Sequence, residues 1–230
     1  MTDSSALKVL EPLKIPTVAE TVFEELHQQI LSLELAPGTK VSEIEVAKAF
    51  GVSRQPVRDA FFRLSQLGFL SIRPQRATVI TKISEAAVLR ARFVRTALEL
   101  ACLRAALEVV TEDDVKDLEK LLQEQQAAVD AGERQLFHRL DDDFHRRICA
   151  LSGHDYVWSL IKEQKAHMDR VRFLSLAYAA QTALDDHIEI VAAIREGKGG
   201  VAEAKLTEHL GRIQTILGRI RDENPGHFQE

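Results

Sequence analysis

The chain has 230 residues, of which 45% are hydrophobic and 28% charged, a globular composition that excludes collagen-like, low-complexity and disordered classes. No apolar run approaches the roughly 20 residues of a membrane-spanning helix, and the first residues show no basic-then-apolar leader, so we expect neither a secretory signal nor a membrane partner. Two cysteines, Cys102 and Cys149, are too few for a disulfide framework, which favours the reducing cytoplasm.

The net charge of −5 is distributed unevenly along the chain. Residues 51–82 carry +5, whereas residues 1–50 carry −4 and residues 83–230 carry −6. A compact basic segment inside an acidic chain is typical of a local contact with a polyanion. A solvated basic face would have the same composition, so the charge alone leaves both interpretations open.

The chain begins with two predicted helices. Thr17 can cap the first, over residues 17–33, in which apolar side chains recur at helical spacing. The second starts at Ser42, which can form a capping box with Glu45, and Gly51 ends it.

A third helix is predicted to follow at once, with Ser53 as its N-cap and Pro56 in its first turn. Two helices joined by a tight glycine turn form a helix-turn-helix, whose second helix enters the DNA major groove N-terminus first. Arg54, Gln55 and Arg58 lie at that end, off the apolar stripe. Arginine matches the edge of guanine and glutamine that of adenine, and Ser53 with the free amides can hold a phosphate. We therefore expect this helix to read DNA.

Two short strands, residues 69–72 and 78–81, are predicted next. The turn between them, Arg73-Pro74-Gln75-Arg76, is cationic. A β-wing of this kind beside a recognition helix would lie over the neighbouring DNA backbone or minor groove.

Residues 17–81 resemble the GntR family of bacterial transcription regulators. The specific signal is the string Gly51-Val52-Ser53-Arg54-Gln55-Pro56-Val57-Arg58, supported by Pro37-Gly38, by Leu67-Gly68-Phe69-Leu70 and by the wing. By position, the resemblance implies DNA contacts from Ser53, Arg54, Gln55, Arg58, Gln75 and Arg76. The alternative is a helix-turn-helix that serves only to dock another protein.

From Ser84 onward the pattern is helical almost throughout, with glycines at the breaks. The expected helices cover residues 84–109, 112–131, 133–151, 155–178, 182–196 and 199–222. Short loops favour an antiparallel bundle. The expected fold is therefore mainly α, with a winged helix-turn-helix domain over residues 1–82 and an all-helical bundle over residues 83–230.

Four side chains in this half form a candidate metal site. Asp141 and His145 are four residues apart and so share one helix face. His187 and His209 each replace a core residue on an inward helix face, and burying an unpartnered imidazole is costly. Each histidine alone is more often a satisfied core residue, but together one carboxylate and three imidazoles suit Zn, Ni, Mn or Fe, with zinc preferred. Such a set leaves coordination positions open for water or a carboxylate.

Residues 84–220 resemble the FCD ligand-binding domain of the FadR-like branch of the GntR regulators. The matching residues are Arg95-Thr96-Ala97-Leu98-Glu99, the Asp141 and His145 pair, and two late histidines 22 positions apart. The resemblance implies a divalent metal at Asp141, His145, His187 and His209 and a small organic acid as effector. Arg95 is a candidate partner of that acid, or else one half of an exposed pair with Glu99.

The expected function is a metabolite-responsive transcriptional repressor that binds a palindromic operator as a homodimer joined through the helical domain. Two alternatives stay open. One is a metal-dependent hydrolase with a nucleic-acid-binding tether, although no obvious general base lies near the ligands. The other is a nucleoid or adaptor protein with a vestigial pocket.

Overall fold

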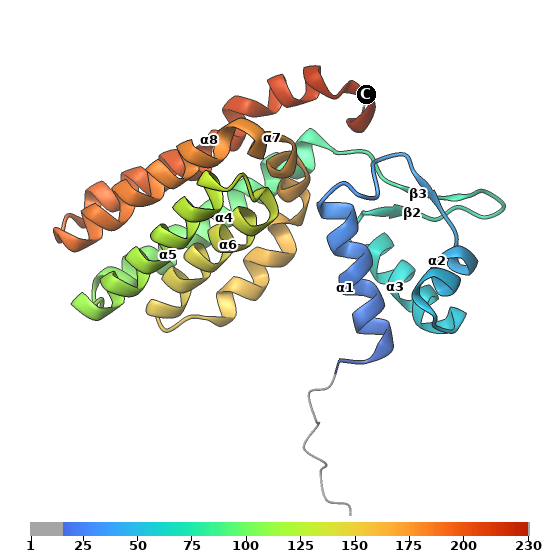
Figure 1. Ribbon diagram of the computed structural model, residues 1–230, viewed down its shortest axis with the longest axis horizontal. Coiled ribbons are helices and arrows are strands. Elements are labelled where there is room, and N and C mark those ends of the chain that lie inside the picture. The colour runs from blue at the N-terminus through green and yellow to red at the C-terminus, as the bar shows by residue number, and fades with distance from the viewer. Residues whose placement is uncertain (1–15, 230) are drawn as a thin grey trace, which may run out of the picture.

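The computed structural model describes residues 16–229, except for the side chains of residues 176–178. A helix-turn-helix with a small sheet lies beside a helical bundle (Figure 1), which confirms the expected mainly α fold. None of the helices in the described part of the chain is long and apolar enough to span a membrane. The segment 1–15, for which no secretory signal is expected, lies outside the described residues.

The N-terminal half contains α1 (Val18–Leu31), α2 (Glu43–Phe50) and α3 (Arg54–Gln66). The expected capping box at Ser42 is only half formed, because Glu45 accepts a hydrogen bond from the Ser42 hydroxyl and not from its backbone N–H. Ser53 caps α3 without a side-chain hydrogen bond. Its hydroxyl is therefore available to a ligand.

The wing belongs to a three-stranded antiparallel sheet of β1 (Lys40–Val41), β2 (Leu70–Ser71) and β3 (Thr78–Ile80), in the order β1-β3-β2. Both expected strands are present but shorter, and β1 was not expected, because two residues give no alternation to detect. At the wing tip Gln75 has a φ of +60°. Phe69 and Ile80 are buried against α1 and α3 in one core.

The helical half contains five long helices, whose bounds are α4 (Glu85–Leu107), α5 (Glu112–Asp130), α6 (Arg134–Leu151), α7 (Tyr156–Arg195) and α8 (Gly199–Glu223). The expected break between residues 178 and 182 was wrong, since α7 is one helix of 40 residues. No glycine or proline interrupts this stretch, and Ala179 and Ala180 favour helix. A short 3₁₀ turn, η2 (Pro225–His227), brings Phe228 beside Ile83 at the junction of the two halves.

A buried histidine in the core of the N-terminal half predicts pH-dependent stability. The His27 ring packs between Phe23 and Phe69, at centroid distances of 5.3 and 5.1 Å. Burial lowers the pKa of His27 to about 4. Since an unfolded histidine titrates near 6.5, the unfolded chain binds the extra proton below that pH, and the contribution of His27 to stability is lost as the pH falls from about 6.5 towards 4.

At pH 5 the difference between the folded and unfolded pKa of His27 lowers the free energy of unfolding by about 2 kcal/mol. Denaturant unfolding at pH 7 and pH 5 measures this effect. The free energy of unfolding should fall less between the two pH values for His27→Phe than for the wild type. His154→Phe, at an exposed histidine, is the matched control and should behave as the wild type. Equal losses for the wild type and His27→Phe would contradict the assignment.

Candidate metal centre and DNA-binding surface

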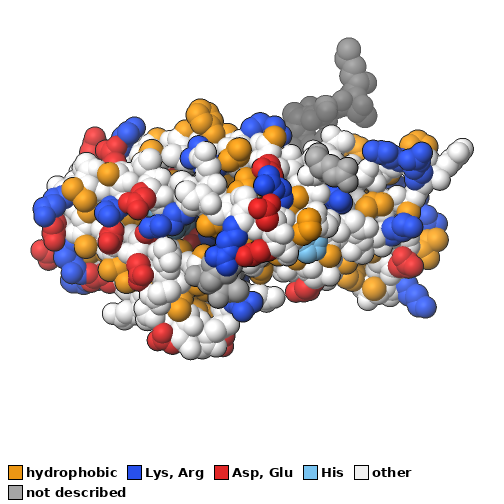
Figure 2. Space-filling view, turned by 90° about the horizontal axis from the view of Figure 1, so that it is seen from above, with side chains coloured by type: hydrophobic (Ala, Val, Ile, Leu, Met, Phe, Trp, Pro, Cys, Tyr) orange, Lys and Arg blue, Asp and Glu red, His pale blue; other side chains and the backbone are white. Residues whose placement is uncertain are grey.

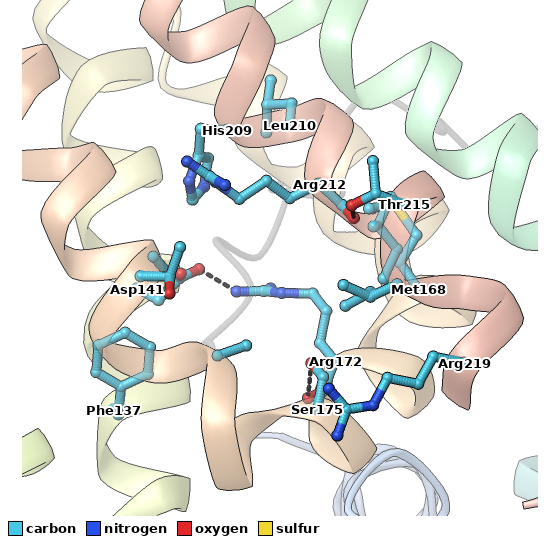
Figure 3. A pocket seen from close by; sticks show the side chains of 15 residues that line it. Phe137, Asp141, Met168, Arg172, Ser175, His209, Leu210, Arg212, Thr215 and Arg219 are labelled. Atoms are coloured by element: carbon cyan, nitrogen blue, oxygen red, sulfur yellow. Dashed lines mark hydrogen bonds and ion pairs between the residues drawn. The ribbon is translucent and has the colours of Figure 1, made fainter. Parts of the chain in front are cut away.

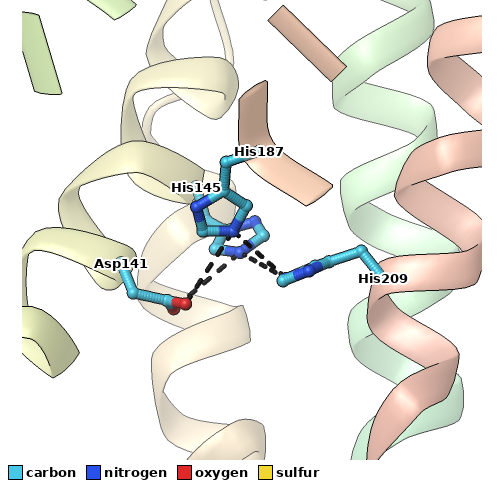
Figure 4. A group of neighbouring side chains, drawn as sticks. All are labelled: Asp141, His145, His187 and His209. Carbon is cyan, nitrogen blue, oxygen red and sulfur yellow. Dashed lines mark hydrogen bonds and ion pairs between the residues drawn. The ribbon is translucent and has the colours of Figure 1, made fainter. Parts of the chain in front are cut away.

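The four candidate ligands converge in the middle of the helical half (Figure 4). Asp141 and His145 come from α6, His187 from α7 and His209 from α8, and their ligand atoms all lie within 4.8 Å of one another. Nε2 of His209 is 3.2 Å from Nε2 of His145 and 3.3 Å from Nε2 of His187. The Asp141 carboxylate lies 3.8 Å from Nε2 of His145 and from Nε2 of His187.

The opposite nitrogen of each imidazole is held by a polar side chain. Nδ1 of His145 is 2.6 Å from Glu99, Nδ1 of His187 is 2.9 Å from the Gln125 amide oxygen, and Nδ1 of His209 is 3.2 Å from Asp186. The Gln125 orientation is fixed because its amide nitrogen donates to the Leu140 carbonyl. Hydrogen bonds at Nδ1 of His187 and His209 favour the tautomer with the proton there. Nδ1 of His145 makes no hydrogen bond among the described residues, but the carboxylate of Glu99 at ion-pair distance favours a proton on the same nitrogen. Outer partners of this kind orient histidine ligands in metal sites.

The inner nitrogens then face one another as acceptors. With the protons on Nδ1, the three Nε2 lone pairs point into a space that also receives Oδ1 of Asp141, a buried oxygen without a hydrogen-bond partner among the described residues. Burial lowers the pKa of His187 and of His209 and so favours the neutral, ligating form of both rings. A cluster of nitrogen and oxygen acceptors with no donor between them fits a divalent cation.

Asp141 remains ionised despite being fully buried. Burial opposes the charged carboxylate, but the Arg172 guanidinium holds the pKa of Asp141 well below its usual range. Arg172 donates to Asp141 through Nη2 in a very short hydrogen bond. Oδ2 of Asp141 is thus held by arginine and also lies 3.8 Å from Nε2 of His145, whereas Oδ1 lies 3.8 Å from Nε2 of His187.

A cavity of about 280 Å³ opens beside this cluster (Figure 3). Asp141 and His209 form part of its wall, so the candidate metal position is accessible from it. Cationic side chains also line the cavity, together with apolar residues such as Phe137 and Met168; the cationic lining residues are Arg172, Arg212 and Arg219. The volume and the cationic lining suit a small anion.

Arg95 does not line this cavity. It is 2% exposed, and its Nε donates to Glu99 at 2.5 Å, so the pair with Glu99 exists but is buried and not exposed as considered from the sequence. Its Nη2 is buried and has no hydrogen-bond partner among the described residues. Burial raises the pKa of Glu99, but Arg95 and His145 outweigh this effect and lower the pKa to about 2. The Glu99 carboxylate therefore stays ionised beside His145.

Glu99 offers a direct test of the outer partners. Glu99→Gln should weaken zinc binding by about 10- to 100-fold, because the neutral amide no longer fixes the His145 ring as a strong acceptor does. Competition with a chromophoric zinc chelator measures the affinity. Glu203→Gln, at a partly exposed glutamate of α8 that pairs with Arg104 of α4, is the control and should bind zinc as the wild type. Unchanged affinity in Glu99→Gln would contradict a role for this contact.

The candidate DNA-contacting residues lie at the opposite end of the molecule. Figure 2 shows lysine and arginine side chains at the winged end, whereas both charges are interspersed over the helical half. All six candidates are exposed; they are Ser53, Arg54, Gln55, Arg58, Gln75 and Arg76. Arg54, Arg58 and Arg76 line one groove next to β1, which brings the recognition helix and the wing together, while Gln75 lies outside that groove at the wing tip.

An acid not singled out from the sequence holds the two recognition arginines. Glu43, in the first turn of α2, accepts from Arg54 at 3.1 Å and lies 3.5 Å from Arg58. Gln55 donates instead to Asp59, at 2.9 Å. These contacts are solvent-exposed ion pairs and hydrogen bonds that a nucleic acid can replace at small cost.

Comparison with known proteins gives matches over nearly the whole chain. Residues 18–80 match the family described as "Bacterial regulatory proteins, gntR family", and residues 91–212 match the FCD domain family. The HTH-type transcriptional repressor RspR of Escherichia coli K12 is 36% identical over 93% of this chain and 94% of its own length. The probable D-xylose utilization operon transcriptional repressor of Paenarthrobacter nicotinovorans is 28% identical over 84% of this chain and 86% of its own.

Among solved structures, E. coli McbR/YncC superposes with a TM-score of 0.72 over 91% of this chain and 99% of its own, at 21% identity. A regulator from Rhodococcus sp. RHA1 superposes with a TM-score of 0.70 over 87% of this chain and 97% of its own, at 20% identity. At these identities the superpositions establish the shared fold.

Proposed function

We propose that this chain, which belongs to the GntR family of bacterial regulatory proteins and carries an FCD domain, controls transcription in response to a small organic acid bound at a divalent metal. It is a DNA-binding transcriptional regulator and not an enzyme, so a metal-dependent hydrolase is set aside. The metal would be held by Asp141, His145, His187 and His209, with zinc preferred.

The observation that carries this proposal is the convergence of three Nε2 atoms and one unpartnered carboxylate oxygen beside a cationic cavity. A cation there would satisfy all four acceptors at once. The side chains hold it from one side, so a carboxylate entering the cavity could complete its coordination sphere. Arg172 and Arg212 line the cavity and are placed to neutralise that carboxylate, a role that Arg95, outside the cavity lining, does not share.

On the DNA side, we propose that Ser53, Arg54, Gln55 and Arg58 contact the major groove and its backbone, and that Gln75 and Arg76 contact the DNA from the wing. A single module of this size reads few bases. A twofold homodimer would place two recognition helices about one DNA turn apart, roughly 34–36 Å, on a palindromic operator. The helical domain, residues 83–230, would supply the dimer contact and residues 1–82 the DNA contact.

We also propose that the protein acts as a repressor in the cytoplasm. Two relatives are named as repressors, RspR and the D-xylose operon regulator. Release of a repressor by the metabolite of its own operon requires that effector and operator bind different states of the protein.

A thermal-shift experiment on the full chain tests the metabolite proposal. The protein is stripped with a chelator and then given zinc chloride, alone or with members of a panel of small carboxylic acids. Zinc should raise the unfolding temperature, since a ligand that binds only the native state stabilises it, by about 2.7 kcal/mol at 100 times its Kd. At least one acid should add a further shift only when zinc is present. No shift with zinc or any other divalent transition metal would overturn the proposal.

A further inference from the structure

The two functional ends of the protein are joined by one short stretch of α7. Residues 165–172 face two ways: Ala166, His167 and Arg170 point towards the DNA-reading half, and Lys165, Asp169 and Arg172 point towards α6. We call these eight residues the α7 junction. Positions 166, 167 and 170 share one helix face, and positions 165, 169 and 172 share the next.

On the first face, the α7 junction is built into the winged domain. Ala166 is buried in the same hydrophobic core as α1, α3 and the sheet. His167 lies with Nε2 3.0 Å from the Leu67 carbonyl oxygen, and its ring stacks on Phe69 at a centroid distance of 4.5 Å. These contacts hold the point at which α3 passes into the wing.

Arg170 holds the other end of the wing. Its Nη1 donates to the Thr81 carbonyl at 2.7 Å, directly after β3, and its guanidinium lies 5.3 Å from the Phe69 ring centre. The side chain is 1% exposed and has no acidic partner within ion-pair distance among the described residues. A buried guanidinium without a carboxylate costs stability. Packing alone does not require a charged side chain at this position. The hydrogen bond from Arg170 to Thr81 instead indicates a role in positioning the wing.

On the second face, the α7 junction forms part of the candidate effector site. Arg172 lines the cavity, binds Asp141 and lies 3.2 Å from Asp169. Lys165, 1% exposed, joins Asp169 at 2.7 Å and Asp142 at 2.9 Å. Asp141 and Asp142 are adjacent on α6, so these ion pairs fasten the α7 junction to the helix that carries two of the four candidate metal ligands.

We propose that the α7 junction transmits the state of the metal site to the wing, with Arg170 and His167 as the positioning residues. This inference rests on the proposed function and names how it is regulated. A cation that fixes Asp141 also fixes Arg172, and an acid in the cavity competes with Asp141 for the same guanidinium. Arg172 and Arg170 are two residues apart on a continuous helix, so a shift of one moves the other, and with it Leu67 and Thr81 at the two ends of the wing.

Hydrogen exchange measured by mass spectrometry tests this route on the full chain, comparing chelator-stripped protein with protein given zinc chloride alone. In the wild type, zinc should slow exchange both in α6 and α8 around the site and in the wing stem, residues 67–71 and 78–81. In Arg170→Met, zinc should still slow exchange in α6 and α8, but the wing-stem response should fall by about fivefold or more, the lower range of allosteric couplings. Arg104→Gln, an exposed arginine on α4, should behave as the wild type.

His167→Phe keeps an aromatic ring against Phe69 and removes the contact with the Leu67 carbonyl. If circular dichroism shows that Arg170→Met does not fold, His167→Phe provides the same test. A full wing-stem response in these variants would overturn the inference. So would a wild type in which zinc protects α6 and α8 and leaves the wing stem unchanged, while the proposed function would stand. If zinc changes exchange nowhere in the wild type, the proposed function itself fails.

Discussion

Replacing both His187 and His209 with alanine is expected to give a protein that holds no zinc. The two imidazoles supply half of the four candidate ligands and come from two different helices, so their loss leaves only Asp141 and His145 on α6. Structural zinc sites use about four protein ligands and catalytic sites about three, and two ligands do not retain the ion against a chelator. We expect about one zinc per wild-type chain and less than a tenth of that in the variant.

Elemental analysis after gel filtration in a mild chelator measures the content. His154→Ala with His227→Ala removes two histidines outside the cluster and is the matched control, which should keep its zinc. Circular dichroism of the double variant serves to check that the protein remains helical. Full occupancy in a folded His187→Ala, His209→Ala protein would show that the metal lies elsewhere.

Arg54→Ala is expected to abolish sequence-specific DNA binding while the helical half stays intact. Arg54 is the first residue of α3 and is 57% exposed, and its contacts with the rest of the protein are the exposed pair with Glu43 and the groove beside β1. A bidentate arginine contact with guanine contributes about 1–3 kcal/mol to base discrimination. The proposed homodimer would lose this contact twice, about 2–6 kcal/mol or roughly 30- to 20,000-fold in specific affinity.

Selection of operator fragments from genomic DNA, followed by a gel-shift titration at one fixed salt concentration, measures this loss. Arg104→Ala removes an equally exposed arginine from the helical half and should bind as the wild type. Non-specific binding should persist in Arg54→Ala, because the remaining basic residues still neutralise phosphates. A specific affinity within threefold of the wild type would contradict the groove assignment for α3.

The DNA-reading half was predictable because its signals are local. Thr17, Ser42 and Ser53 each mark a helix start, Gly51 marks the turn, and the apolar stripe leaves Arg54 and Arg58 facing outward. Strand β1 was not predicted because its two residues pair only with β3, which follows the recognition helix in the sequence. The expected break between residues 178 and 182 has no glycine or proline behind it, unlike the breaks at Gly132, Gly153 and Gly197, and α7 runs through it as one helix.

The candidate ligands could be nominated from helical spacing, because histidines at core positions require a reason to be buried. Their outer partners could not. Glu99, Gln125 and Asp186 lie on three different helices and meet the imidazoles only through tertiary packing. The cationic cavity is equally non-local, since Arg172 and Arg212 look like ordinary surface residues in the sequence. Arg95 was nominated for the effector, and its burial beside Glu99 became visible only in the structure.

The most direct test of the central claim is an anomalous diffraction measurement on crystals of the zinc-loaded protein, recorded above and below the zinc absorption edge. We expect one strong peak about 2.0–2.2 Å from Nε2 of His145, His187 and His209 and from Oδ1 of Asp141. A zinc peak bound by other residues, or no peak while these four side chains keep the arrangement described above, would contradict it.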